Sequence, residues 1–120
     1  MYKGKIVEKT EAVVVLTTVN DGFDAAGLAR TLVERGLAAC VNVFPAVTSV
    51  YRWEDKIQTD AEQQLLIKTT ATKVVDLEKA IRELHPYDLP EFIVLPVIGG
   101  SASYLAWIKS LDQWLDTLDM

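Results

Sequence analysis

The stretch Leu84–Pro96 reads LHPYDLPEFIVLP and contains the only histidine of the chain, His85, with three of its four prolines. Proline disfavours helical backbone angles at the residue before it, so Pro86 predicts that a helix ends at about Leu84. A second proline, Pro90, restricts its own predecessor in the same way. We therefore expect a stiff connection between a helix and a strand, with side chains held in fixed positions.

Such a connection can form one wall of a binding site, or it can be an ordinary link between two elements. Its polar side chains are His85, Tyr87, Asp88 and Glu91. Local physics alone favours the ordinary link, by about two to one.

Three segments show the 3.6-residue apolar period of amphipathic helices. The helix before the stretch covers 72–84, with Thr70 or Thr72 as a possible N-cap and a buried stripe of Val74, Leu77, Ile81 and Leu84. An earlier helix, capped by Asn20 or Asp21 and ended by a left-handed Gly36, has the apolar face Ala25, Leu28, Ala29, Leu32 and Val33. A last helix follows Ser101, with one apolar side made of Tyr104, Leu105, Ile108, Leu111, Leu115 and Leu118 and a second line made of Trp107 and Trp114.

Four segments are predicted to be strands. The run 12–18 is apolar on both faces, which suits a central strand, whereas Pro96 assigns the strand 91–98 to an edge. Segments 37–53 and 57–70 form a long hairpin around a tight reversal at Glu54, Asp55 and Lys56, where Asp tolerates positive φ. Pro45 requires an edge or a bulge in the first arm.

The predicted order is strand, helix, strand, strand, helix, strand and a terminal helix. This order indicates the α+β class, as a ferredoxin-like βαββαβ sandwich with a long hairpin between its second and third strands and a C-terminal helix. The length predicts a single domain over residues 1–120. Because the strands are apolar on both faces, we expect the open face of the sheet to be covered by other copies of the chain.

Composition excludes several classes of partner. The net charge is −5 and no run of Lys or Arg forms a basic stripe, so we expect neither nucleic acid nor a membrane surface as a partner. Apolar runs are much shorter than the ~20 residues of a membrane span. A single cysteine, Cys40, and an N-terminus without an apolar core favour a reducing cytoplasm.

Few residues can support catalysis or bind a metal. The motifs CxxC, HxxxH and HExxH are absent, and Cys40 is expected to be a buried structural thiol. Glu62 and Lys68 are six residues apart on one strand and can share a face, either in a ligand pocket or in a cross-strand charge network. Tyr51 and Trp53, on one face of the projecting hairpin, suggest an interface.

The sequence resembles the CutA divalent-cation-tolerance family from Val13 to Ile108. The segments that carry the resemblance include Ala38-Ala39-Cys40-Val41-Asn42, Ser49-Val50-Tyr51-Arg52-Trp53, Ile67-Lys68-Thr69-Thr70, His85-Pro86-Tyr87 and Leu89-Pro90-Glu91. The resemblance implies a homotrimer whose hairpins join sheets across subunit boundaries, similar to the trimers of PII nitrogen-signalling proteins. It also implies that the protein responds to copper or other divalent metal ions.

The copper ligands that the family implies are only partly present. They are a cysteine in the first strand and two adjacent histidines before Pro-Tyr, and the corresponding residues here are Thr17, Leu84 and His85. With one imidazole left, the sequence predicts weak binding of Cu²⁺ or another divalent cation at His85, lost as the ring protonates near its usual pKa of about 6.5. The alternative is that His85 only packs and hydrogen-bonds in its loop.

Three functional hypotheses follow. The first is a non-enzymatic homotrimer linked to divalent-cation tolerance. The second is a PII-like regulatory trimer that binds a small ligand in clefts between subunits, formed by Tyr51, Trp53, Glu62, Lys68, His85, Tyr87 and Glu91. The third is a small enzyme similar to acylphosphatases, which share the expected fold. It is disfavoured because the turn after the first strand reads TTVNDG and has no arginine.

Overall fold

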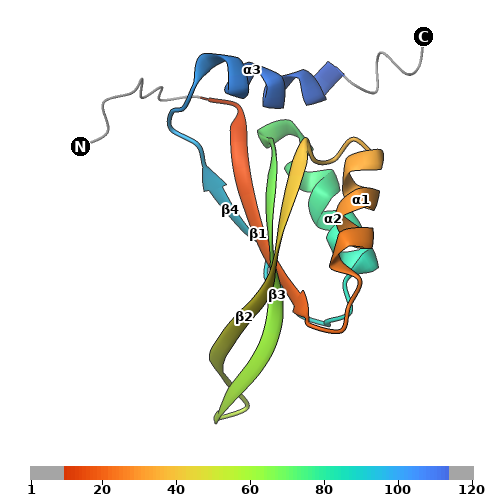
Figure 1. The fold of residues 1–120 in the computed structure, drawn as a ribbon, viewed down its shortest axis with the longest axis vertical. Coiled ribbons are helices and arrows are strands. Elements are labelled where there is room, and N and C mark those ends of the chain that lie inside the picture. The colour runs from red at the N-terminus through yellow and green to blue at the C-terminus, as the bar shows by residue number, and fades with distance from the viewer. Residues whose placement is uncertain (1–9, 114–120) are drawn as a thin grey trace.

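The computed structural model describes residues 10–113 (Figure 1). The main elements are β1 (Ala12–Asn20), α1 (Ala25–Glu34), β2 (Cys40–Trp53), β3 (Lys56–Thr70), α2 (Val74–Leu84), β4 (Ile93–Pro96) and α3 (Ala102–Lys109). Short 3₁₀ turns at Ala71–Lys73 and Ser110–Gln113 precede α2 and follow α3. The predicted order of strands and helices is therefore confirmed, and with it the mixed α+β class.

The four strands form one antiparallel sheet in the order β2-β3-β1-β4. The run that is apolar on both faces lies at the centre, in β1, as predicted. The strand that contains Pro96 lies at one edge and the strand that contains Pro45 at the other. The register between β2 and β3 shifts between Phe44 and Val47, so Pro45 falls within a bulge, where the ladder does not need its missing N–H.

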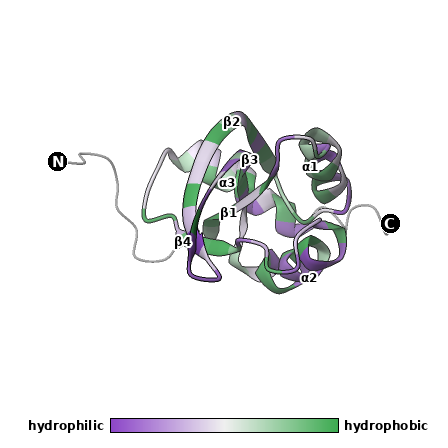
Figure 2. Ribbon diagram, turned by 90° about the horizontal axis from the view of Figure 1, so that it is seen from below, coloured by the Kyte–Doolittle hydropathy of each residue, from purple (hydrophilic) through white to green (hydrophobic). Residues whose placement is uncertain are grey.

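One face of the sheet is covered by α1 and α2, which lie side by side on it (Figures 1 and 2). Alternation along β1 and β3 directs every second side chain towards these helices, and Val15, Leu65 and Ile67 are fully buried there. Leu32 of α1 and Leu77 and Ile81 of α2 complete the core. The core therefore lies between the two helices and one face of the sheet, which we call the helix-facing face.

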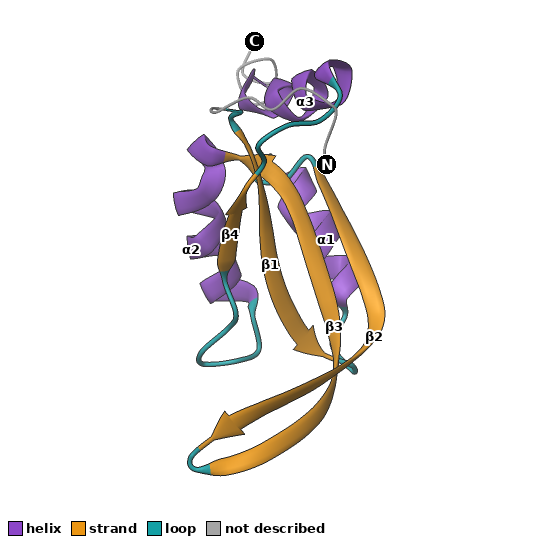
Figure 3. Ribbon diagram, turned by 90° about the vertical axis from the view of Figure 1, so that its left-hand side faces the viewer, coloured by secondary structure: helices purple, strands orange, loops and turns teal. Residues whose placement is uncertain are grey.

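The opposite face, which we call the open face, carries the other alternate residues. Leu16 of β1 pairs with Leu66 of β3 and Ile93 of β4, and Val14 pairs with Leu95, so these side chains share it. No helix among residues 10–113 lies along it, since α3 crosses one end of the sheet instead (Figure 3). Leu95 keeps 43% of its surface exposed. In the single chain, this face is apolar and uncovered.

The hairpin formed by β2 and β3 projects beyond the rest of the sheet, at the end opposite α3 (Figures 1 and 3). Its strands are joined by Glu54 and Asp55, whose φ values of 49° and 64° are typical of a two-residue hairpin turn with positive φ at both positions. The predicted positive φ at Asp55 is confirmed. Tyr51 and Trp53 pair with Gln58 and Lys56, which places both aromatic rings on the side of the hairpin continuous with the open face.

Both predicted caps of the first two helices were wrong. The N-cap of α1 is Asp24, whose side chain accepts a hydrogen bond from the Gly27 N–H, because the turn extends further than Asn20 or Asp21. Thr70 and Thr72 do not cap α2. Their hydroxyls instead donate to Asp112, a tertiary partner about forty residues away. The cap at Ser101 and the left-handed Gly36, with φ of 71°, are confirmed.

Other boundaries and burials also differ from the prediction. The arm expected from residue 37 begins as a strand at Cys40, which is half-buried rather than buried, and the last strand spans 93–96 rather than 91–98. Val33 is 39% exposed at the end of α1 and lies outside the buried stripe. In the last helix, Ile108 and the following Leu111 are buried, as expected. The predicted positions Trp114, Leu115 and Leu118 lie outside the described residues.

Candidate functional site

The loop after α2 is held in place by the ring of His85. The helix ends at Leu84, as predicted, and His85 itself has extended backbone angles, with φ of −81° and ψ of 140°. Its Nε2 lies 2.6 Å from the Thr18 carbonyl oxygen of β1, and its Nδ1 accepts the Tyr87 backbone N–H at 3.0 Å. Only 8% of His85 is exposed, and this burial lowers the pKa of the imidazole, against the opposing effects of the Thr18 hydrogen bond and the Glu62 charge.

Tyr87 joins this loop to the sheet. Its hydroxyl donates to a carboxylate oxygen of Glu62 at 2.8 Å, and its ring stands edge-on to the His85 ring with centroids 4.8 Å apart. Burial, followed by the hydrogen bond to Glu62, raises the pKa of Tyr87. Glu62 is 7% exposed although it lies near the root of the hairpin. The Tyr87 phenol is therefore a neutral donor at physiological pH.

A second phenol–carboxylate pair lies next to the first. The Tyr51 hydroxyl donates to the carboxylate of Asp60, and this hydrogen bond is the main reason that the pKa of Tyr51 is raised. Asp60 and Glu62 are two residues apart on β3, so they share a face, and the charge of Asp60 also helps to raise the pKa of Tyr87. Sequence reasoning missed Asp60, although the same alternation that relates Glu62 to Lys68 also includes it.

Trp53 is the outermost of the predicted site residues on the hairpin. It pairs with Lys56 next to the turn and is 50% exposed. Its ring does not stack on another aromatic ring among residues 10–113. It lies on the same side of the hairpin as Tyr51 but does not join the hydrogen-bonded cluster.

Glu91 closes the loop at its far end. One oxygen of its carboxylate accepts a hydrogen bond from the Gln64 side-chain amide at 3.3 Å, and the same amide donates to the Thr17 carbonyl at 2.8 Å. Sequence reasoning did not identify Gln64 as a site residue. Thus the structure brings together Tyr51, Glu62, His85, Tyr87 and Glu91, with Asp60 and Gln64 as added members.

Lys68 does not join this group. Six residues along β3 separate it from Glu62 by about 20 Å. Its ammonium contacts the Tyr104 hydroxyl at 3.3 Å and lies over the Tyr104 ring, at the end of the sheet near α3. Within one chain, Glu62 and Lys68 therefore form neither a common pocket nor a charge pair.

The family-implied metal ligands do not fit a metal site in this chain. Thr17 is fully buried on the helix-facing face, and its hydroxyl finds no hydrogen-bond partner among the described residues. Both ring nitrogens of His85 are engaged in hydrogen bonds. Residues 10–113 contain no cluster of three or more His, Cys, Asp or Glu side chains that could hold an ion. The copper contact expected at His85 gains no support from this geometry.

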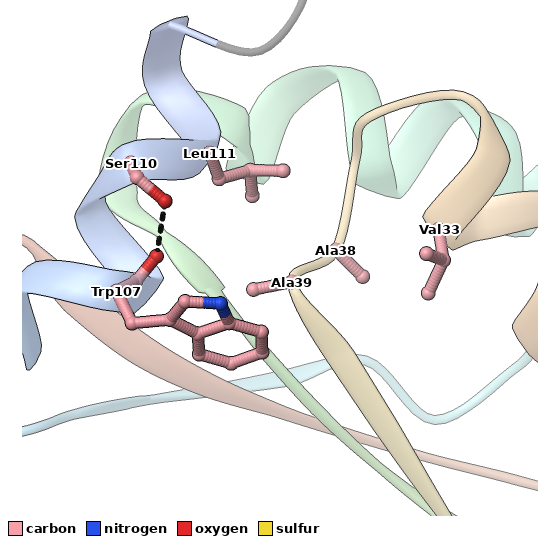
Figure 4. A pocket seen from close by; sticks show the side chains of 6 residues that line it. All are labelled: Val33, Ala38, Ala39, Trp107, Ser110 and Leu111. Carbon is pink, nitrogen blue, oxygen red and sulfur yellow. Dashed lines mark hydrogen bonds between the residues drawn. The ribbon is translucent and has the colours of Figure 1, made fainter. Parts of the chain in front are cut away.

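A separate hollow of about 250 Å³ lies beneath α3 (Figure 4). Its lining comes from α1, the segment before β2, and α3 with the turn that follows, and consists of Val33, Ala38, Ala39, Trp107, Ser110 and Leu111. None of these side chains is ionisable. The hollow therefore offers apolar contact but no acid, base or charge.

Comparison with known proteins assigns the family. The family model described as CutA1 divalent ion tolerance protein matches residues 13–111. This chain belongs to the CutA1 family. It is 44% identical over 96 residues to the divalent-cation tolerance protein CutA of Thermus thermophilus, which covers 80% of this chain and 93% of that protein.

Two further CutA relatives show how far the resemblance extends. The chloroplastic CutA protein of Arabidopsis thaliana is 43% identical over 82% of this chain, and the match spans 54% of the plant protein. The crystal structure of CutA1 from a psychrotrophic Shewanella bacterium superposes with a TM-score of 0.81 at 41% identity, covering 86% of this chain and 96% of the other.

The names of these relatives refer to divalent-cation tolerance or to CutA alone, and none of the names states a catalytic activity. Because one of the relatives is chloroplastic, the cytoplasmic location stays a prediction. Among residues 10–113, no helix has the length and apolar character needed to cross a membrane.

Proposed function

We propose that this chain is a non-enzymatic homotrimeric protein that acts in divalent-cation tolerance, each subunit being a single ferredoxin-like domain. The name of the Thermus relative supports the process. The βαββαβ order and the strand order β2-β3-β1-β4 support the ferredoxin-like description. Catalysis is not part of the proposal, because the names of the matched family and of the Thermus relative refer to divalent-cation tolerance and state no reaction.

The observation that carries the trimer is the uncovered apolar open face. Leu16, Leu66, Ile93 and Leu95 lie together on it, and β2 adds the exposed ring of Phe44. Monomers rarely leave an apolar surface of this kind in contact with water. Because the aromatic side of the hairpin continues this face, association of identical chains would cover both at once.

Light scattering at micromolar concentration tests the trimer. We expect a mass about three times the 13.3 kDa of the chain. A stable mass of one chain at that concentration would contradict the proposal. Repeating the measurement after dilution separates a specific trimer, which keeps its mass down to its dissociation constant, from aggregates of variable size.

The proposed contact with metal is weak and spread over surface carboxylates. A net charge of −5 attracts cations, and this attraction falls as salt screens it. We expect titration calorimetry with copper(II) to give the same shallow isotherm for the wild type and for His85→Ala. If the wild type shows a saturating step at one metal per chain and His85→Ala does not, the metal is bound at His85 and the proposal of surface carboxylates is wrong.

A PII-like regulatory trimer is the alternative, favoured by one specific observation. Two phenol–carboxylate pairs, Tyr51 with Asp60 and Tyr87 with Glu62, lie side by side where the hairpin leaves the sheet. In an assembly built on the open face, they would border clefts between subunits and could contact a small ligand.

A thermal-melting screen separates the two candidate functions, because a ligand that binds only the folded form raises the melting temperature. The screen should include divalent metals, nucleotides and anions. Tyr87→Phe removes the hydroxyl that contacts Glu62, and Tyr104→Phe is the matched control at the far end of the sheet. A shift by a nucleotide or anion that is lost only in Tyr87→Phe favours the regulatory trimer, whereas shifts by metals alone favour the first proposal.

A further inference from the structure

The hydrogen bonds of His85 define its tautomer. A backbone N–H can only donate and a carbonyl oxygen can only accept. The contact of Nδ1 with the Tyr87 N–H therefore leaves Nδ1 without a proton, and the 2.6 Å contact of Nε2 with the Thr18 carbonyl requires the proton on Nε2. The ring is neutral in this state, and both of its nitrogens have a partner within the chain.

This tautomer leaves no nitrogen free for a metal ion. A metal binds the lone pair of an unprotonated ring nitrogen. The lone pair of Nδ1 is already used by Tyr87, and Nε2 could offer one only after giving up its proton and the bond to Thr18. Either route breaks one of the two contacts that hold the loop.

The same contacts connect three elements. Thr18 lies in β1, Tyr87 in the loop that follows α2, and Glu62 in β3. The His85 ring binds the first two through hydrogen bonds and packs edge-on against the Tyr87 ring, whose hydroxyl reaches the third. His85 therefore determines where the Tyr87 phenol meets the buried carboxylate of Glu62.

We propose that His85 is a positioning residue that latches Tyr87 onto Glu62 and so fixes this wall of the candidate site, and that it is not a metal ligand in the folded chain. The latch rests on hydrogen bonds within one chain. Only the use of the wall by a ligand depends on the proposed regulatory function.

Nitrogen-15 NMR of the wild-type protein, without an affinity tag, tests the latch directly. The chain has one histidine, so its ring signals are unambiguous. At a pH where the ring is neutral, we expect a protonated Nε2 and an unprotonated Nδ1, and both signals should stay unchanged when equimolar zinc(II) is added. A proton on Nδ1, or a ring signal that moves with zinc, would overturn the proposal.

Two variants separate a latch from simple packing. In His85→Asn the amide oxygen can replace Nδ1 as acceptor for the Tyr87 N–H, whereas His85→Ala has no acceptor. We expect hydrogen exchange of the Tyr87 amide to be at least about tenfold faster in His85→Ala than in the wild type, with His85→Asn close to the wild type. Equal exchange in the two variants would contradict the latch.

The outcomes of these tests are independent of the proposed function. If His85→Ala fails to fold, the wild-type tautomer and the zinc titration still decide the question. A monomeric mass in light scattering would remove the trimer and leave the ring signals as expected. Conversely, finding the proton on Nδ1 would refute the latch, but it would not change the expected trimer or the outcome of the ligand screen.

Discussion

Leu65 and Leu66 are neighbours on β3 with opposite environments. Leu65 faces α1 and α2 and is fully buried, whereas Leu66 faces the open side with Leu16 and remains partly exposed. The two residues have the same side chain and the same local sequence, so composition does not distinguish them. The difference shows that one chain supplies the cover for only one of its two apolar faces.

The helix-facing face is therefore a property of the folded subunit, and the open face is a property of the proposed assembly. Substitutions on the first should change the stability of each subunit whatever the protein concentration. Substitutions on the second should act through association, and their effects should depend on concentration. Four measurements test this difference between the two faces and the environments of single side chains, in order of decreasing expected effect.

The largest effect is expected from Leu65→Ala. Removing a fully buried leucine leaves a cavity, and the free energy of unfolding should fall by about 3–4 kcal/mol. Denaturant unfolding at several protein concentrations measures it. Leu66→Ala is the matched control, whose effect should vary with concentration. If the two losses are equal and both independent of concentration, the distinction between the faces fails.

Trp53→Ala comes next and acts on the hairpin. As an exposed aromatic anchor on the open side, Trp53 should contribute about 2 kcal/mol to association. We expect sedimentation to show trimers that dissociate at a higher concentration, with little change in the far-ultraviolet circular dichroism of the subunit. A variant that remains as tightly trimeric as the wild type would show that Trp53 is not an anchor.

Smaller changes in the free energy of unfolding, opposite in sign to each other, are expected for substitutions of two fully buried threonines. The Thr17 hydroxyl has no partner among the described residues, whereas the Thr69 hydroxyl donates to the Leu37 carbonyl at 2.8 Å. Thr17→Val should therefore stabilise the protein by about 1 kcal/mol, and Thr69→Val should destabilise it by a similar amount. Chemical denaturation of both variants tests this, and destabilisation by Thr17→Val would mean that its hydroxyl has a partner.

The smallest effect is a pH dependence from His85. Burial lowers the pKa of its imidazole below the ordinary value of about 6.5, so the unfolded chain takes up a proton at a higher pH than the folded chain. The contribution of the neutral His85 ring to the free energy of unfolding is therefore complete above the unfolded-state pKa of about 6.5. It is lost as the pH falls through the pKa of the folded state. We expect denaturation midpoints measured between about pH 8 and pH 5 to show this loss in the wild type and a smaller one in His85→Asn. Parallel profiles would assign the loss to other groups.

The elements that sequence predicted well depend on local constraints. Pro86 ended α2 at Leu84, Gly36 adopted the left-handed conformation, and Asp55 took positive φ in a two-residue turn. Pro45 and Pro96 placed their strands at the two edges of the sheet. Each of these outcomes follows from what one residue allows its own backbone to do, which requires no knowledge of the rest of the fold.

The candidate site was predicted only in part. The loop residues His85, Tyr87 and Glu91 were named from the sequence, but Asp60, the partner of Tyr51, and Gln64, the partner of Glu91, were not. Both lie on β3, where Gln64 is 27 residues from Glu91 in the sequence, and polar residues on an exposed strand give no local signal of a role. Glu62 and Lys68 share a face of β3 but do not meet within one chain, because residues on one strand face can lie far apart along the strand. Their place in a common cleft between subunits stays a prediction.

The amino-acid sequence alone was enough to predict the order of the elements, the end of α2 at Leu84 and the family. Apolar periodicity, proline and glycine act over a few residues, and those residues are adjacent in the chain. Three features became visible only in the folded chain: Asp112 accepts from Thr70 and Thr72, both nitrogens of His85 are engaged, and the buried Thr17 hydroxyl has no partner within residues 10–113. Hydrogen bonding at a buried group depends on which distant atoms the packed strands and helices bring within reach.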